Sequence, residues 1–261
     1  MPRFKLLIEY AGGRYSGWQI QTNARTVQGE IDRAVGDATG RREFELYGAG
    51  RTDAGVHALA QVAHLDIYTA LAPAALRARI NERLPSDIHV RRIDKVPRKF
   101  HARHDAVSRS YVYQIARRKT AFFKPFVWWI KEPLDVDRMR EAARAFVGMK
   151  NFESFSAEAE LETSTMVLVD RIELAEIGAL LLIRIQGSHF LWRMVRRIVG
   201  VLATVGRGEL TPADMERLLS ERSPLPATLT APASGLFLEG VYYPGDAGPG
   251  ELEASLRIPN P

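Results

Sequence analysis

Residues 44–67 read FELYGAGRTDAGVHALAQVAHLDI, two strand-like runs separated by a glycine-rich loop. The runs are Phe44 to Tyr47 and His57 to Ile67. Between them Asp53 lies among glycines, two residues after Arg51. Glycines allow sharp turns and the close approach of another molecule, and a neighbouring arginine favours an ionised carboxylate. The loop alone fits an Asx turn in a hairpin as well as it fits a reactive carboxylate.

Strands and helices extend outward from this loop in a regular order. Phe4 to Tyr10 alternates as a strand, and Ile88 to Val96 is a second strand at the other end. Two helices are indicated by apolar stripes, one capped by Thr26 (Val27, Ile31, Ala34, Val35) and one starting at Pro73 (Leu76, Ile80, Leu84). The order strand, helix, strand, strand, helix, strand predicts a ferredoxin-like half.

The rest of the chain repeats this plan with one extra strand and one extra helix. The predicted segments are strands at 107–116, 126–130, 166–175, 180–186 and 236–243, helices from Asp135 and over 190–205, and a short extra helix capped by Thr211. We therefore expect an α+β fold with ferredoxin-like halves at 1–104 and 105–244. Residues 245–261 are rich in glycine and proline and are expected to form a loose tail.

Composition limits the chemistry. The 261 residues are 46% hydrophobic and 26% charged, with a formal net charge of +5, and they include no cysteine. Disulfides, iron–sulfur clusters, thiolate zinc sites and cysteine nucleophiles are therefore excluded. No apolar run approaches the ~20 residues of a membrane helix, so a cytoplasmic protein is expected. His101 and His104 have a spacing that is a weak metal signal, and no metal is predicted.

Two tyrosines begin the second half in the run FHARHDAVSRSYVYQIA, residues 100–116. Alternation places Tyr111 and Tyr113 on one face of a strand, where buried core tyrosines are the ordinary explanation.

Three arginines, Arg193, Arg196 and Arg197, fall on the polar arc of the predicted helix 190–205. A solvated basic face and a phosphate-binding face both fit this arrangement. A further loop, AGGRYSGWQIQ at 11–21, could cradle phosphates and offers Arg14 and Gln19 as RNA contacts.

These motifs together resemble the tRNA pseudouridine synthase A family over roughly residues 4–244. The string GAGRTDAGVHA is similar to the family signature in which the aspartate, here Asp53, is catalytic. The resemblance implies that Tyr111 stacks on the target uracil and that Arg196 pairs with Asp53. We further expect Arg51 to fill the space that a flipped base leaves, and Arg14, Gln19, Arg193 and Arg197 to contact RNA.

As the resemblance implies, the fold is the pseudouridine synthase fold, in which the two halves form a continuous, mainly antiparallel sheet with helices on one face and a central RNA-binding cleft. The implied reaction isomerises uridines 38, 39 and 40 in the anticodon stem-loop of tRNA, without a cofactor and in a homodimer. Residues 158–170 depart from the family pattern, which leaves RNA and dimer contacts there open.

Two other classes of protein remain as alternatives. One is an RNA-binding module without activity, which would not need Asp53. The other is a different base-modifying enzyme, of which a zinc deaminase is excluded by the missing C-x-x-C. A dinucleotide oxidoreductase is excluded because no G-x-G-x-x-G follows a first strand.

Overall fold

The computed structural model describes residues 1–157, 164–256 and 258. Residues 158–163 of the divergent segment therefore lie outside the described residues. The chain forms two compact units, one of Met1–Val107 with Phe237–Gly248 and one of Ser108–Leu236 with Pro249–Pro261.

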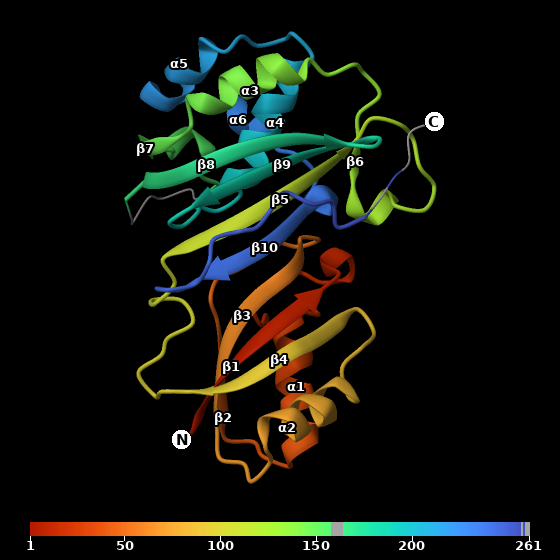
Figure 1. Ribbon diagram of the computed structural model, residues 1–261, viewed down its shortest axis with the longest axis vertical. Helices are drawn as coiled ribbons and strands as arrows, with labels where there is room; N and C mark the ends of the chain where they lie inside the picture. Colours follow the sequence, from red (N-terminus) through yellow and green to blue (C-terminus); the bar gives the residue numbers. More distant parts are fainter. Residues whose placement is uncertain (158–163, 257, 259–261) are drawn as a thin grey trace. The chain divides into compact units, whose positions relative to one another are not determined.

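The first unit is a sheet with two helices on one face (Figure 1). Its elements in chain order are β1 (Arg3–Tyr10), α1 (Val27–Thr39), β2 (Phe44–Gly48), β3 (His57–Ile67), α2 (Pro73–Asn81) and β4 (Ile88–Val96). The strands pair antiparallel in the order β4-β1-β3-β2. This is the order of a ferredoxin-like sheet, so the prediction from periodicity is confirmed for this unit.

Local sequence explains why these elements begin and end where they do. The Thr26 hydroxyl accepts a hydrogen bond from the Gly29 N–H and caps α1, and Gly40 ends the helix at φ +67°. Along β1 the side chains alternate between half-exposed and buried, and the buried ones reach the core. Burial of that apolar face against α1 and α2 stabilises the unit.

Strand β3 has different partners along its length. Residues 63–67 pair with β2, whereas His57 and Ala58 pair in parallel with Phe237 and Leu238 of β10 (Leu236–Tyr242). The chain between β2 and β3 leaves the sheet in this interval and carries Asp53. Residues Phe237–Gly248 lie with the first unit, which differs from the predicted halves, because periodicity identifies a strand but not its partner.

The second unit is also a mostly antiparallel sheet with helices gathered on one side (Figure 1). The sheet order is β5 (Ser108–Ala116), β9 (Leu180–Gly187), β8 (Met166–Ile177) and β7 (Gly148–Asn151), with β6 (Trp128–Trp129) parallel to β5. The helices are α3 (Val136–Arg144), α4 (Met194–Gly206), α5 (Asp214–Ser220) and α6 (Leu225–Thr228). The α+β class expected from the sequence is confirmed.

Described residues of the C-terminal stretch, among them Gly250, Glu251 and Ile258, are packed, in contrast to the loose tail that its composition suggested. Buried Arg184 of β9 donates hydrogen bonds to the carbonyl oxygens of Gly250 and Glu251. Ala179 donates to the carbonyl of Ile258, whose side chain is buried in an apolar cluster. The glycine and proline content indicated irregular backbone correctly, but these tertiary contacts hold that backbone in place.

Candidate active site and RNA-binding residues

Asp53 begins a tight turn between β2 and β3. The Val56 N–H donates to the Asp53 carbonyl at 3.1 Å, and Gly55 has φ +80°, as the third residue of a type II turn requires. Asp53 itself is half-buried. Just before it, Thr52 is buried and its hydroxyl pairs with the Tyr10 hydroxyl at 2.8 Å. The carboxylate thus lies on a turn that is closed by its own backbone hydrogen bond and preceded by a residue hydrogen-bonded to Tyr10.

The glycine-rich loop 11–21 holds this turn in position. The Trp18 N–H donates to the Thr52 carbonyl at 3.0 Å, and the Gly55 N–H donates to the Tyr15 carbonyl at 3.3 Å. The Gly12 N–H donates to Nδ1 of His57 at 3.0 Å. Several backbone N–H groups of the loop therefore donate to acceptors within the protein. These hydrogen bonds support a role for the loop in positioning the Asp53 turn.

Two glycines in this loop are required by the close approach of the turn. A Cβ on Gly12 would lie 1.8 Å from the Val56 carbonyl oxygen, and one on Gly17 would lie 2.7 Å from the Thr52 carbonyl oxygen. Gly17 also has φ +95°, a conformation that other residues rarely adopt. Gly13, in contrast, faces open space.

Arg14 and Gln19, the expected RNA contacts of this loop, are both exposed. The Arg14 guanidinium lies 4.0 Å from the Asp87 carboxylate. That carboxylate also accepts a hydrogen bond from the Tyr15 hydroxyl, and burial together with this bond raises the pKa of Tyr15. Asp87 therefore anchors the same loop that supports the Asp53 turn.

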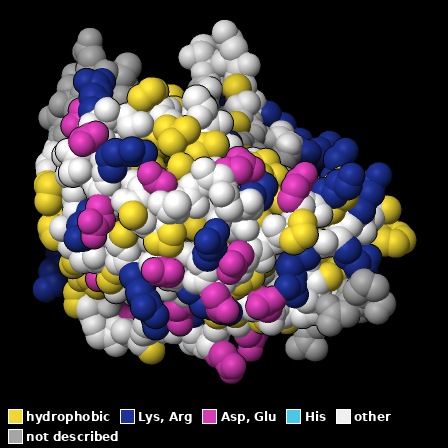
Figure 2. Space-filling view, turned by 90° about the horizontal axis from the view of Figure 1, so that it is seen from above, with side chains coloured by type: hydrophobic (Ala, Val, Ile, Leu, Met, Phe, Trp, Pro, Cys, Tyr) yellow, Lys and Arg dark blue, Asp and Glu magenta, His cyan; other side chains and the backbone are white. Residues whose placement is uncertain are grey.

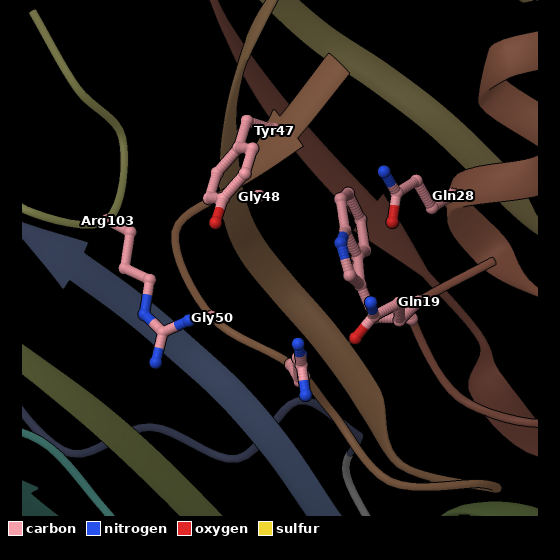
Figure 3. A pocket seen from close by; sticks show the side chains of 8 residues that line it. Gln19, Gln28, Tyr47, Gly48, Gly50 and Arg103 are labelled. Carbon is pink, nitrogen blue, oxygen red and sulfur yellow. The ribbon is translucent and has the colours of Figure 1, made fainter. Parts of the chain in front are cut away.

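A small pocket of about 90 Å³ opens beside the Asp53 turn, within the first unit (Figure 3). Its lining brings together two predicted residues, Arg51 and Gln19. It also includes Arg103, Tyr47 and Gln28, for which the sequence predicted no role. Arg103 belongs to a His-Ala-Arg run, residues 101–103, at the start of the stretch quoted above from residue 100, and this run was the only sign of it in the sequence.

Histidines pack beside Tyr47 behind this pocket. His64 stacks on the Tyr47 ring with centroids 5.7 Å apart, and its Nδ1 accepts a hydrogen bond from Ala102. Burial, with smaller effects from Arg3 and His101, lowers the pKa of His64 to about 4. His64 is thus a neutral support of the pocket wall near neutral pH. Among the described residues no group of three or more acidic or histidine side chains fits a metal ion.

Tyr111 and Tyr113 lie in different surroundings on β5 of the second unit. Tyr113 is fully buried, its hydroxyl donates to the Pro232 carbonyl at 2.8 Å, and burial raises its pKa well above the usual value. Tyr111 is half-exposed and meets the ring of Phe190 edge-on, with centroids 5.3 Å apart. The buried core position that alternation suggested for both tyrosines is confirmed for Tyr113 alone, and the ring of Tyr111 is half-exposed.

The three arginines of the predicted basic arc have three different positions. Arg193 precedes α4, is exposed, has φ +60° and lies 4.9 Å from the Trp192 ring centroid. Arg196 is half-buried in the first turn, and its Nε donates to the Ala231 carbonyl at 2.8 Å. The helix begins at Met194, four residues later than predicted, so Arg193 is not on its surface.

Arg197 contradicts the expectation of a surface contact with RNA. Its side chain is buried and donates hydrogen bonds to the carbonyl oxygens of Ser154 and Ser156, and burial lowers its pKa. The prediction of a surface position for Arg197 was wrong because it rested only on the polarity of residues around the predicted helix. It could not show that the segment around η3 (Glu153–Phe155) covers this part of α4 with carbonyl groups.

The surface does not form a single basic field on the face seen in Figure 2, where Lys and Arg side chains are interspersed with Asp and Glu. Within residues 1–157, 164–256 and 258, no helix has the length and apolar character needed to cross a bilayer.

A family model described as "tRNA pseudouridine synthase" matches residues 6–105 and 142–244. This range includes the Asp53 turn, the His-Ala-Arg run and helix α4. The protein belongs to this family.

Individual relatives match over nearly the whole chain. The chain is 37% identical to the tRNA pseudouridine synthase A of Pseudothermotoga lettingae, over 93% of this chain and 100% of the relative. It is 40% identical to that of Exiguobacterium sibiricum, over 94% and 98%. It is also similar to a chain in the crystal structure of the archaeal box H/ACA sRNP Nop10-Cbf5 complex, with a TM-score of 0.36 and 11% identity, covering 78% of this chain and 42% of that one.

Proposed function

We propose that this protein isomerises uridine to pseudouridine in tRNA. The observation that carries the proposal is the near-complete match to tRNA pseudouridine synthases across the turn that holds Asp53. The reaction breaks the N1–C1′ glycosidic bond, turns the uracil and forms a C5–C1′ bond. The C5 proton leaves and N1 ends protonated, so the reaction is redox-neutral and balances without a co-substrate.

Asp53 is the proposed catalytic carboxylate. Cleavage of a glycosidic bond has oxocarbenium character, which a nearby carboxylate can stabilise or trap. The turn supports this role because it presents one half-buried carboxylate next to Thr52, whose carbonyl is bonded by the Trp18 backbone N–H and whose hydroxyl is bonded to the Tyr10 hydroxyl. Attack on C1′, addition to C6 of the base and removal of a ribose proton all remain compatible with this position.

Tyr111 and Arg196 are the proposed partners of Asp53 in the reaction. The half-exposed Tyr111 ring can stack on the turning base, and its hydroxyl can handle the C5 proton. Arg196 would keep Asp53 ionised against the effect of burial. The Arg196 backbone and side chain both bond Ala231, an arrangement that would hold its guanidinium in one orientation.

Substrate binding is proposed to involve base flipping, which costs about a few kcal/mol. Arg51 would fill the vacated space, while Arg14, Gln19 and Arg193, all exposed, would contact the RNA. The proposed targets are uridines 38, 39 and 40 of the anticodon stem-loop, bound by a cytoplasmic homodimer.

The deciding experiment maps pseudouridine by mass spectrometry in tRNA from cells that lack this protein, with and without the wild-type gene restored. Loss of pseudouridine at positions 38–40, restored by the wild-type protein and not by Asp53→Asn, is the expected result. Unchanged pseudouridine would leave the alternative of an RNA-binding protein without activity. Loss at other positions would retain the chemistry and change the substrate site.

A further inference from the structure

The pocket beside the Asp53 turn has a floor that is built into the fold. Trp18 is only 2% exposed, and its indole faces Gly48, where a Cβ would lie 2.6–2.9 Å from the ring atoms. Any larger residue than glycine at position 48 would collide with this floor. Because the backbone N–H of Trp18 donates to the Thr52 carbonyl oxygen, the floor is fixed relative to the Asp53 turn.

The charged groups at the pocket favour an anion. Two of the eight lining residues are arginines, Arg51 from the Asp53 loop and Arg103 from the His-Ala-Arg run, and none is acidic. Figure 3 shows the Arg103 side chain extending toward the segment at Gly50. Paired guanidinium groups bind phosphate with good geometry. The pocket volume of about 90 Å³ leaves room for a phosphate group.

The remaining lining groups suit the base of a nucleotide. The Tyr47 ring is 46% exposed, and contacts with His64 and His101 fix its orientation. An exposed aromatic ring is a stacking surface for an unpaired base. Gln28 donates to the Leu46 carbonyl at 2.9 Å, which orients its amide at the pocket wall (Figure 3). Asp53 is not among the lining residues, so the pocket lies beside the candidate catalytic carboxylate and does not contain it.

We propose that this pocket binds the phosphate of an RNA nucleotide next to the isomerised uridine, between Arg51 and Arg103, with its base against Tyr47. The inference rests on the proposed function for the identity of the RNA. It assigns Arg103 and Tyr47 to substrate binding, outside the reacting groups.

The test is a double-mutant cycle between Arg103 and single phosphates of the RNA. Stem-loop RNAs each carry one neutral methylphosphonate near the target uridine, and their affinity is measured with Asp53→Asn protein, so that no turnover occurs. The comparison protein adds Arg103→Met, and the matched control adds Arg98→Met. Arg98 is also exposed in the first unit but does not line the pocket.

Arg103→Met should weaken binding of unmodified RNA about tenfold and reduce the salt slope by about 0.7 to 0.9, the effect of one phosphate contact. One methylphosphonate should weaken binding to the parent protein and cause no further loss with Arg103→Met. Arg98→Met should leave that same methylphosphonate effect unchanged. Tyr47→Leu should weaken binding without altering the salt slope, because stacking carries no charge.

Additive losses at every methylphosphonate position, or equal behaviour of Arg103→Met and Arg98→Met, would overturn the proposal. If Arg103→Met fails to fold, Arg103→Lys replaces it, and loss of selectivity for one phosphate position is then the expected result. Pseudouridine formation by the wild-type protein is measured separately. Activity of the wild-type protein together with no coupling in the Asp53→Asn proteins refutes the pocket alone, whereas coupling without wild-type activity refutes the proposed isomerisation alone.

Discussion

The backbone N–H of Trp18 donates a 3.0 Å hydrogen bond to the carbonyl oxygen of Thr52, the residue before Asp53. One motif of the sequence thereby holds another in place, across 34 residues of chain. The contact is possible because Gly17, with φ +95°, brings the backbone of loop 11–21 against the turn. The position of the candidate catalytic carboxylate therefore depends on glycines that never contact a substrate in this proposal.

Gly12→Ala should damage both folding and activity, and Gly13→Ala is its matched control. A Cβ at Gly12 would lie 1.8 Å from the Val56 carbonyl oxygen, whereas none of the described atoms lies within 4 Å of one at Gly13. We expect Gly12→Ala to lower the free energy of unfolding by about 2 kcal/mol or more, since a packed backbone must move. Gly13→Ala should stay within about 0.5 kcal/mol. Urea denaturation and single-turnover assays measure the two effects, and equal stability of the variants would contradict this account.

Asp53→Asn keeps the shape of the side chain and removes its charge. We expect turnover to fall at least ~10³-fold while tRNA affinity stays nearly constant, because the proposed role of the carboxylate is in the chemical step. Asp37→Asn, at an exposed position of α1, is the control for loss of a negative charge. Activity of Asp53→Asn within tenfold of the wild type would remove Asp53 from the reaction.

Tyr111→Phe and Tyr113→Phe should have opposite effects. Tyr113→Phe leaves the Pro232 carbonyl without its hydrogen bond, so we expect a loss of about 1–2 kcal/mol in the free energy of unfolding and little change in rate. Tyr111→Phe should retain stability and stacking but slow the chemical step if its hydroxyl moves a proton. Thermal melts and single-turnover rates at saturating tRNA separate them. Similar rate losses in both variants would show that the assignment is wrong.

The arginines around the start of α4 should separate into three roles. Arg196→Met should lower the rate at saturating tRNA, because Asp53 would lose its proposed charge partner. Arg197→Met should mainly lower the free energy of unfolding, by about 1–3 kcal/mol, since two carbonyls lose their buried donor. Arg193→Met should leave the rate and the free energy of unfolding unchanged. It should reduce the salt slope of tRNA binding by the amount expected for about one phosphate contact. A salt titration beside unfolding and single-turnover measurements tests all three, and a stable but inactive Arg197→Met protein would place that residue in the reaction instead.

His64 should make the protein less stable in mild acid. Its pKa is about 4 in the folded state and about 6.5 when unfolded, so the unfolded state takes up a proton first as the pH falls. The His64 contribution is fully present above pH 6.5 and is lost progressively between pH 6.5 and 4. His64→Gln should show a smaller drop across this window in urea titrations, whereas His89→Gln, at an exposed position, should keep the wild-type drop. An unchanged pH profile in His64→Gln would contradict this mechanism.

Periodicity predicted most elements of the fold because one-sided burial leaves a local pattern. Strand β3 occupies His57–Ile67, as the alternating and apolar run indicated, and the Thr26 cap begins α1 as expected. Helix α4 begins at Met194 rather than Phe190, because the apolar stripe continues into residues that are packed but not helical. The apolar pattern records which residues are buried and does not record the backbone angles between them.

The sequence by itself determined the α+β class, the family and the turn that carries Asp53, since these depend on residue types at fixed spacings along a continuous stretch. The tertiary structure decided which arginines are accessible to a substrate. Arg193 is exposed and Arg196 is half-buried, whereas Arg197 is buried and donates hydrogen bonds to the carbonyl oxygens of Ser154 and Ser156. It also placed Arg103 beside Arg51 at one pocket, across 52 residues of chain. Burial and partners arise from segments distant in the sequence, and no local pattern encodes which of them will meet.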